Sequence, residues 1–186
     1  MLDAVGTVVE ELGVAAVRAC RHRLEHVEMV DDAAVARMRA WGMVASVQPA
    51  FDAAWGGDAG MYVERLGSAR AAATNPFAGL ADAGVALALG SDAPVTPLDP
   101  WGGVHAAVDH RTRGSGMRPF DAFDAATHGG WYAARAEHPV GPLSAGAPAH
   151  LALWATTDSL SAVLRDRGRP SCRLLIVAGE PIGENA

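Results

Sequence analysis

The stretch VALALGSDAPVTPLDP, residues 85–100, decides the fold that we expect for this chain. It opens with five consecutive apolar residues, which is typical of a short strand buried on both faces of a parallel sheet. This run leads directly into Gly-Ser-Asp, so that Asp92 follows the end of the strand. Three prolines then punctuate a loop that leads to a predicted helix over 101–109.

Two earlier pieces of the sequence share this arrangement. The apolar run MVASV (43–47) ends at Gln48, and the apolar-alternating piece RHRLEHVEMV (21–30) carries Glu25 and His26. Catalytic groups in (β/α) barrels lie at the carboxyl ends of the strands, where the loops that follow the strands converge. The repeated strand–polar residue–helix order therefore predicts an α/β fold with its chemistry at that end of a parallel sheet.

The length of the chain allows only part of such a barrel. A complete (β/α)8 barrel typically needs about 250 residues, whereas the chain has 186 and offers three strands of this kind. After residue 140 the pattern changes to two strands, at 150–155 and 172–179, without a long helix between them. We therefore expect a partial (β/α)8 TIM-type barrel of about three βα units over 1–140, and part of a small flanking β-domain over 141–186.

Helices are expected around these strands from apolar spacing and end signals. One of them is capped by Asp31 or Asp32 and ended by Gly42. The predicted helices cover residues 2–17, 31–41, 58–66, 75–83, 101–109 and 119–127. Because the chain starts inside the first of these, the sequence looks cut rather than begun.

Composition excludes several classes of partner. The chain has 15 basic residues, all arginine, against 21 acidic residues, for a net charge of −6. Nucleic acid and anionic membranes are therefore not expected as partners, and no apolar run reaches the roughly 18 residues of a membrane span. Cys20 and Cys172 are expected to be reduced core residues. Together with the lack of a signal peptide, this favours the cytoplasm.

His26 and Asp92 are the residues that we expect to carry chemistry. An imidazole nitrogen and a carboxylate oxygen are common ligands of zinc and similar divalent ions, and an aspartate at the rim can also act as a general base. Spacing alone leaves a structural alternative open for both residues. A lone histidine at a strand end commonly serves a structural hydrogen bond, and SDAP (91–94) is also an ordinary turn sequence.

Three strings of the sequence resemble the carboxyl-terminal half of family-3 amidohydrolases, in the YtcJ-like branch. They are RHRLEHVEMVDDAAVARMRAWGMVASVQP (21–49), VALALGSDAPVTPLDPWGGVHAAV (85–108) and GPLSAGAPAHLALW (141–154), and the resemblance extends from about Val5 to Val177. It implies a metal-dependent (β/α)8 barrel with a small flanking β-domain. It also implies hydrolysis of amide-type, non-peptide C–N bonds in a small-molecule substrate, with zinc as the expected metal.

The resemblance assigns roles to individual positions. His26 matches the metal-ligand histidine that ends the sixth barrel strand, and Asp92 matches the aspartate that ends the eighth and serves as metal ligand and general base. Glu25 and Gln48 match positions that line the substrate rim. His105 falls where the family often has a polar residue, and we expect it to be a solvated helix position.

The sequence also departs from the family pattern. It has no HxH pair, no lysine and no fifth-strand histidine, so it supplies two ligands of a site that needs four or five. We therefore expect a fragment that is inactive alone and is completed by a missing N-terminal half or by a homo-oligomer. His150, where the family usually has an aspartate, is expected to be structural.

Two alternatives remain open at this stage. His22-Arg23-Leu24-Glu25-His26 fits the inverted zinc-protease motif H-x-x-E-H, provided that these residues form a helix and a residue such as Glu64 supplies a third ligand. The chain could also be a non-catalytic α/β fragment that binds a partner. The histidines at 110, 128 and 138 are expected to be surface or loop residues, and Trp55 is a candidate to face substrate.

Overall fold

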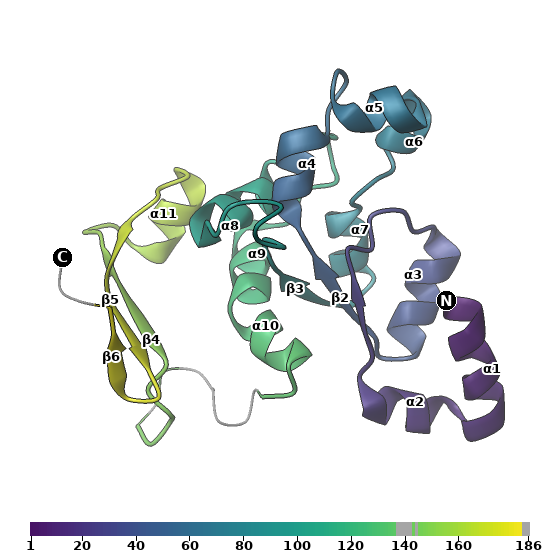
Figure 1. Cartoon of the computed structure of the whole chain (residues 1–186), viewed down its shortest axis with the longest axis horizontal. Coiled ribbons are helices and arrows are strands. Elements are labelled where there is room, and N and C mark those ends of the chain that lie inside the picture. The colour runs from purple at the N-terminus through teal and green to yellow at the C-terminus, as the bar shows by residue number, and fades with distance from the viewer. Residues whose placement is uncertain (137–142, 144, 184–186) are drawn as a thin grey trace.

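A three-stranded parallel sheet lies at the centre of the computed structural model, which describes residues 1–136, 143 and 145–183. Its strands are β1 (Arg23–Glu25), β2 (Val44–Val47) and β3 (Ala86–Leu89), in the order β1-β2-β3. In register, Leu24 lies beside Ala45 and Ala45 beside Leu87. The α/β prediction and all three predicted strands are confirmed (Figure 1).

Helices follow each of these strands. Asp31 caps one of them, because its carboxylate accepts a hydrogen bond from the Ala34 amide at 2.7 Å, and Pro119 opens another at its first turn. The helices before residue 137 are α1 (Leu2–Leu12), α2 (Val14–Cys20), α3 (Asp32–Ala40), α4 (Pro49–Trp55), α5 (Met61–Leu66), α6 (Ser68–Ala71), α7 (Phe77–Asp82), α8 (Pro100–Val108), α9 (Pro119–Ala126) and α10 (His128–Ala133).

The structure corrects the sequence prediction of the helices before residue 137 at four places. The single helix predicted over 2–17 is two helices, because Gly13 takes a φ of 81° that no helix accommodates. The short helices α4, α6 and α10 were not predicted. Pro49 begins α4, where proline is favoured in a first turn, and the paired glycines of α10 weaken its helix signal.

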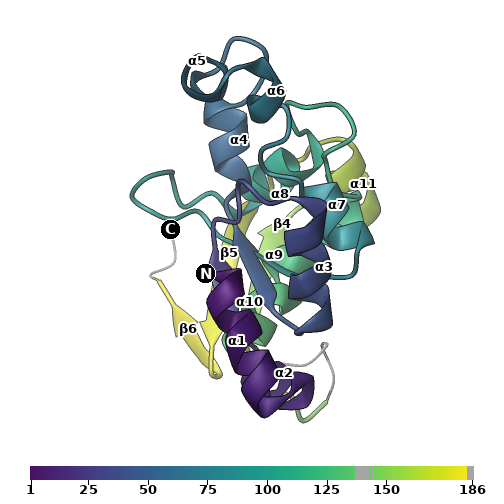
Figure 2. The ribbon, with the colours of Figure 1, turned by 90° about the vertical axis from the view of Figure 1, so that its right-hand side faces the viewer.

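The hydrophobic core lies between the sheet and the helices that cover it. Met38 of α3, Phe77 and Leu80 of α7, and Val47 of β2 are fully buried. Each buried side chain of this size contributes about 1.5–3 kcal/mol relative to an exposed one. Figure 2 shows α4 and α5 at one end of the molecule and α1 and α2 at the other. Helix α4 begins at Pro49, directly after β2 ends.

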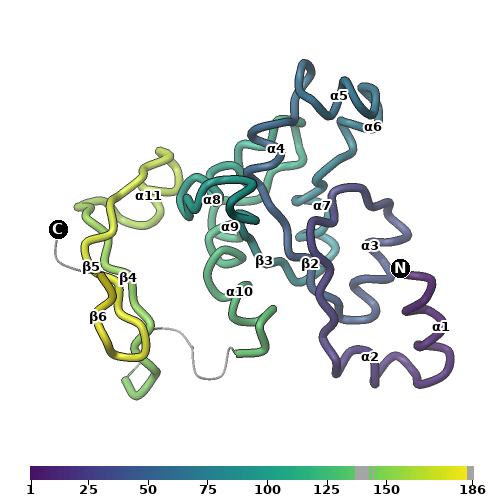
Figure 3. The backbone as a smooth tube through the Cα atoms, in the orientation of Figure 1, coloured from purple at the N-terminus to yellow at the C-terminus, as the bar shows by residue number. Residues whose placement is uncertain are grey.

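A second, antiparallel sheet lies on the opposite side of the molecule from α1 and α2 (Figure 3). It consists of β4 (Leu151–Ala155), β5 (Ser171–Val177) and β6 (Glu180–Ile182), and the short helix α11 (Leu160–Arg165) follows β4. Both strands predicted for this region are confirmed. The predicted boundary at residue 140 lies outside the described residues and stays a prediction.

Helix α8 joins the two sheets through the arginine-rich turn that follows α11. Arg167 makes a two-pronged ion pair with Asp109, at 2.5 and 2.6 Å, and the Nε2 of His105 lies 2.8 Å from the Gly168 carbonyl oxygen. The prediction that His105 is a solvated helix position is wrong, since the residue is only 6% exposed. Its hydrogen bond across to this turn explains the burial.

Two further observations bear on the sequence predictions. Cys20 and Cys172 are free but exposed, so the expectation that they belong to the core is wrong. Within the described part of the chain, no helix is long and apolar enough to cross a membrane.

Candidate functional site

The carboxyl ends of the three parallel strands bring the predicted site residues to one edge of the sheet. The His26 amide donates to the Ser46 carbonyl oxygen at 2.8 Å, and the Gly90 amide donates to the Val47 carbonyl oxygen at 3.0 Å. Parallel ladder bonding therefore continues up to the residues that precede Asp92. Because neighbouring strands lie about 4.8 Å apart, the ends of β1 and β3 are roughly 10 Å apart.

His26 lies in an unusual turn directly after β1. It is exposed, its φ is 69°, and Val27 follows with a φ of 54°. Its imidazole stacks on the Phe51 ring of α4, with ring centroids 5.8 Å apart and planes inclined by 19°. The ring is therefore held on one side by a buried aromatic residue and is accessible on the other.

Asp92 lies in a tight turn after β3 and is exposed, with a φ of 52°. Its carbonyl oxygen accepts a hydrogen bond from the Val95 amide at 2.9 Å. Ser91 supports the same turn, because its hydroxyl accepts from the Ala93 amide at 3.3 Å and its carbonyl oxygen accepts from the Thr96 hydroxyl. These bonds leave the Asp92 carboxylate at the surface of the sheet edge.

The two predicted rim residues differ in environment. Gln48 is only 5% exposed, its Nε2 lies 3.5 Å from the Ser46 carbonyl oxygen, and its buried Oε1 has no hydrogen-bond partner within residues 1–136, 143 and 145–183. Glu25 is exposed and forms an ion pair with Arg23 on the same face of β1. Gln48 thus lies beneath the edge of the sheet and Glu25 beside it.

The donors at this edge are of a type that binds divalent metals, but there are too few of them for a complete site. One imidazole and one carboxylate suit zinc, but catalytic zinc sites use three protein ligands. Among the residues that the structure describes, no group of three or more histidine, cysteine, aspartate or glutamate side chains could hold a metal ion. The described residues therefore form no complete metal site.

The inverted zinc-protease alternative is wrong. The motif H-x-x-E-H needs a helix that places both histidines on one face. Residues Arg23–Glu25 instead form strand β1, which pairs with β2 over its whole length.

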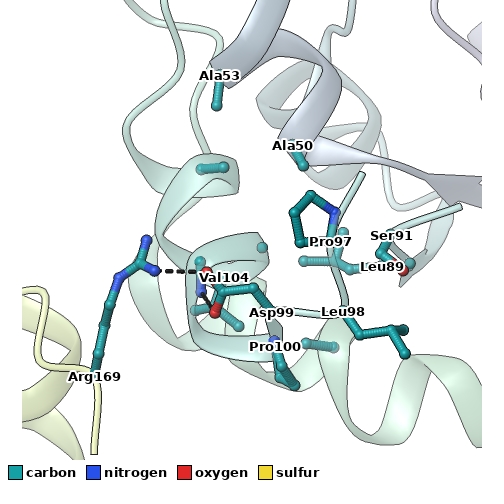
Figure 4. A pocket seen from close by; sticks show the side chains of 15 residues that line it. Ala50, Ala53, Leu89, Ser91, Pro97, Leu98, Asp99, Pro100, Val104 and Arg169 are labelled. Carbon is teal, nitrogen blue, oxygen red and sulfur yellow. Dashed lines mark hydrogen bonds and ion pairs between the residues drawn. The ribbon is translucent and has the colours of Figure 1, made fainter. Parts of the chain in front are cut away.

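A cavity of about 440 Å³ opens at the end of β3 and is lined by Ser91, which directly precedes Asp92; Asp92 itself is not among the lining residues (Figure 4). Its walls come from α4, from the end of β3 with the loop that follows it, and from α8. An ion pair between Asp99 and Arg169, at 2.5 Å, marks one side. The apolar lining residues include Ala50, Ala53, Leu89, Pro97, Leu98 and Val104. The cavity falls within the usual size range of small-molecule pockets.

A buried acid–base pair, formed by Asp52 and His110, was not predicted from the sequence. Asp52 of α4 is 1% exposed, and the His110 side chain is equally buried, with His110 Nε2 3.5 Å from Asp52 Oδ1. The Arg111 amide donates to Asp52 Oδ2 at 2.7 Å. The expectation that His110 is a surface or loop residue is therefore wrong with respect to its exposure. No sequence pattern signals the pair, because its members come from separate segments.

A second missed group lies beside the His26 turn. The Tyr62 hydroxyl of α5 donates to the Glu28 carboxylate, and the Asn75 amide donates to the Glu28 carbonyl oxygen at 2.8 Å. Burial and the Glu28 carboxylate raise the pKa of the Tyr62 hydroxyl well above its ordinary value. Trp55, a candidate to face substrate, packs on Phe51 and lies edge-on to Tyr62.

Comparison with known proteins gives two kinds of match. The sequence model described as "Amidohydrolase family" matches residues 1–182. Two solved structures are similar, uncharacterized metal-dependent hydrolases from Pyrococcus furiosus and Pyrococcus horikoshii OT3. Each is 26% identical over 68% of this chain, with TM-scores of 0.57 and 0.56. The chain covers only 27% and 28% of their respective lengths. No curated protein matches the chain.

Proposed function

Since the chain belongs to the amidohydrolase family, we propose that it forms about three βα units of a metal-dependent (β/α)8 barrel that hydrolyses amide-type, non-peptide C–N bonds. One observation carries this proposal. His26 and Asp92 follow β1 and β3 at the same edge of a parallel sheet, and both are exposed there. Barrel enzymes place their reacting groups at this edge.

We assign His26 and Asp92 as two ligands of a divalent ion, with zinc as the expected metal. Such an ion, when bound, lowers the pKa of a water ligand and polarises a carbonyl oxygen. Because no third donor joins this pair among the described residues, the remaining donors come from outside the described part of this chain. An amino-terminal segment of a longer protein or a second copy of the chain could supply them. The chain alone is then inactive.

Asp92 also serves as the general base in this proposal. Its carboxylate takes a proton from the attacking water and returns it to the leaving nitrogen. Gln48 and Glu25 lie on the rim around the reacting atoms. The Oε1 of Gln48 is an acceptor without a partner among the described residues, so a small shift of this side chain would let it accept from a substrate N–H.

The cavity at the end of β3 supports a substrate with an apolar substituent. Most of its lining is alanine, proline, leucine and valine, and Arg169, the cation on its border, is already neutralised by Asp99. A charged substituent would therefore lose hydration without gaining a counter-ion. The free cysteines agree with a cytoplasmic location.

A zinc titration of the ¹⁵N-labelled chain, followed by NMR, tests the ligand assignment. We expect the amides around residues 26 and 92 to shift together, with the weak affinity of a two-donor site. His26→Ala should abolish the shifts. His128→Ala should not, because His128 is exposed on α10 and paired with Asp124. Zinc shifts that survive in His26→Ala, or that never reach Asp92, would contradict the assignment.

A further inference from the structure

The turn that carries His26 is held by residues to which nothing above assigns a role. We propose that Glu28, Tyr62 and Asn75 form a clamp that keeps His26 and Val27 in the left-handed conformation and so positions the His26 ring. Glu28 and Tyr62 are thus positioning residues. Their relevance to catalysis rests on the proposed function, in which His26 is a metal ligand.

The conformation of the turn demands such support. Two consecutive residues other than glycine have positive φ, 69° at His26 and 54° at Val27. Positive φ is uncommon outside glycine, and for a β-branched residue such as valine it is a genuine outlier. Conformations of this kind persist only where the surroundings over-determine them, and they concentrate at functional sites.

Hydrogen bonds fix the backbone on both sides of the turn. On the strand side, the His26 amide donates to the Ser46 carbonyl oxygen at 2.8 Å and the Val27 amide donates to the Glu25 carbonyl oxygen at 2.9 Å. On the far side, the Glu28 carbonyl oxygen accepts from the Asn75 amide at 2.8 Å. Asn75 is 1% exposed and has a φ of 55° itself, so the turn is anchored to a second constrained residue.

The Tyr62 hydroxyl adds a side-chain anchor to the same residue. It donates to the Glu28 carboxylate from a site where Tyr62 is only 7% exposed. Hydrogen bonds to charged groups are stronger than bonds between neutral ones. A phenol keeps its proton at neutral pH, and burial raises the pKa of this one further, so Tyr62 remains a donor.

An aromatic chain connects Tyr62 to the His26 ring by a second route. The Tyr62 ring lies edge-on to Trp55 at 6.4 Å, Trp55 contacts Phe51 at 4.7 Å, and Phe51 stacks on His26 at 5.8 Å. The backbone route through Glu28 and the ring route through Phe51 thus meet at His26. Tyr62 contributes to both.

Tyr62→Phe tests the clamp, because it removes the hydroxyl and leaves the ring. We expect hydrogen exchange of the Asn75 amide to become about tenfold faster or more, as the loss of a bond to a charged group implies. We also expect the ring-current shift that Phe51 induces in the His26 ring protons to decrease. Tyr132→Phe is the matched control, because it also removes one tyrosine hydroxyl and Tyr132 lies on α10, where its ring contacts Arg21.

A conservative variant separates positioning from general stability. Glu28→Gln keeps an acceptor oxygen for Tyr62 and should retain the slow exchange of the Asn75 amide and the ring-current shift of His26. Glu28→Ala should lose both, while circular dichroism shows that the chain stays folded. The proposal is overturned if Tyr62→Phe leaves both signals as they are in Tyr132→Phe. The zinc titration is a separate measurement. If the Asn75 exchange and the His26 ring shift change as expected but zinc causes no His26-dependent shifts, the clamp stands and only the proposed function is refuted.

Discussion

The buried carboxylate of Asp52 should contribute strongly to the stability of the chain, because it holds α4 to the segment at residues 110–111. Asp52 faces His110 Nε2 at 3.5 Å and accepts from the Arg111 amide at 2.7 Å. The Thr112 amide donates to His110 Nδ1 at 2.9 Å, so a neutral His110 carries its proton on Nε2. The Nε2–H therefore faces the Asp52 carboxylate at 3.5 Å as an electrostatic contact, since Nε2 has no hydrogen-bond partner among the described residues, and the tautomer is fixed by the bond to Nδ1.

This geometry predicts two different costs of substitution. Asp52→Ala leaves two buried N–H groups, the Arg111 amide and His110 Nε2–H, without the carboxylate that they face. At about 1–3 kcal/mol for each, it should lower the free energy of unfolding by about 2–6 kcal/mol. In Asp52→Asn the amide oxygen can still accept from Arg111, but its NH₂ group then meets the Nε2–H of His110. One buried donor is left unmatched, so the expected loss is about 1–3 kcal/mol.

Urea denaturation at pH 7, followed by circular dichroism, measures both losses. Asp58→Asn is the matched control, since Asp58 is exposed in the loop after α4 and should change the free energy of unfolding by less than about 0.5 kcal/mol. If Asp52→Asn unfolds with the same free energy as the control, the donor–donor conflict does not exist and the tautomer assignment is wrong.

Two further predictions concern stability. The Arg167 guanidinium lowers the pKa of the Asp109 carboxyl, so the stability from this exposed pair is present above about pH 4 and lost as pH falls through the lowered pKa. Asp109→Asn should cost about 0.5–1 kcal/mol at pH 7, and urea titrations should show this difference shrinking towards pH 3. A Cβ on Gly129 would lie 2.2 Å from the Leu87 carbonyl oxygen, whereas one on Gly130 would meet nothing within 4 Å. Thermal unfolding should therefore show Gly129→Ala destabilised by about 1–3 kcal/mol and Gly130→Ala stabilised by up to about 1 kcal/mol. Equal effects of the two substitutions would contradict the close approach of Gly129 to the Leu87 carbonyl oxygen.

Local patterns were sufficient to predict the three parallel strands and most of the helices. The strands are short apolar runs with clear ends, and the Asp31 cap has a recognisable sequence signal. Patterns failed where a single backbone angle decides the outcome, as at Gly13. They also failed at α10, whose glycine at 129 is explained by contact with β3 rather than by any local preference.

Sequence position indicated which residues reach the edge of the sheet but not what surrounds them. His105 was predicted to be a solvated helix position and His110 a surface or loop residue, and both are buried. Their burial depends on segments distant in sequence, the turn at Gly168 for His105 and Asp52 for His110. Tertiary contacts of this kind leave no periodic trace, so hydropathy alone could not have revealed them.

The carboxylate of Asp99 is one of the links between the second sheet and the candidate site. Asp99 caps α8, with Oδ1 accepting from the Gly102 amide at 2.8 Å and Oδ2 accepting from Arg169 at 2.5 Å. Arg169 directly precedes the residues that lead into β5, and it borders the cavity at the end of β3. A displacement of the second sheet would therefore move both the start of α8 and one wall of the cavity. The carboxyl-terminal segment thus helps to shape the candidate site, although neither proposed metal ligand belongs to it.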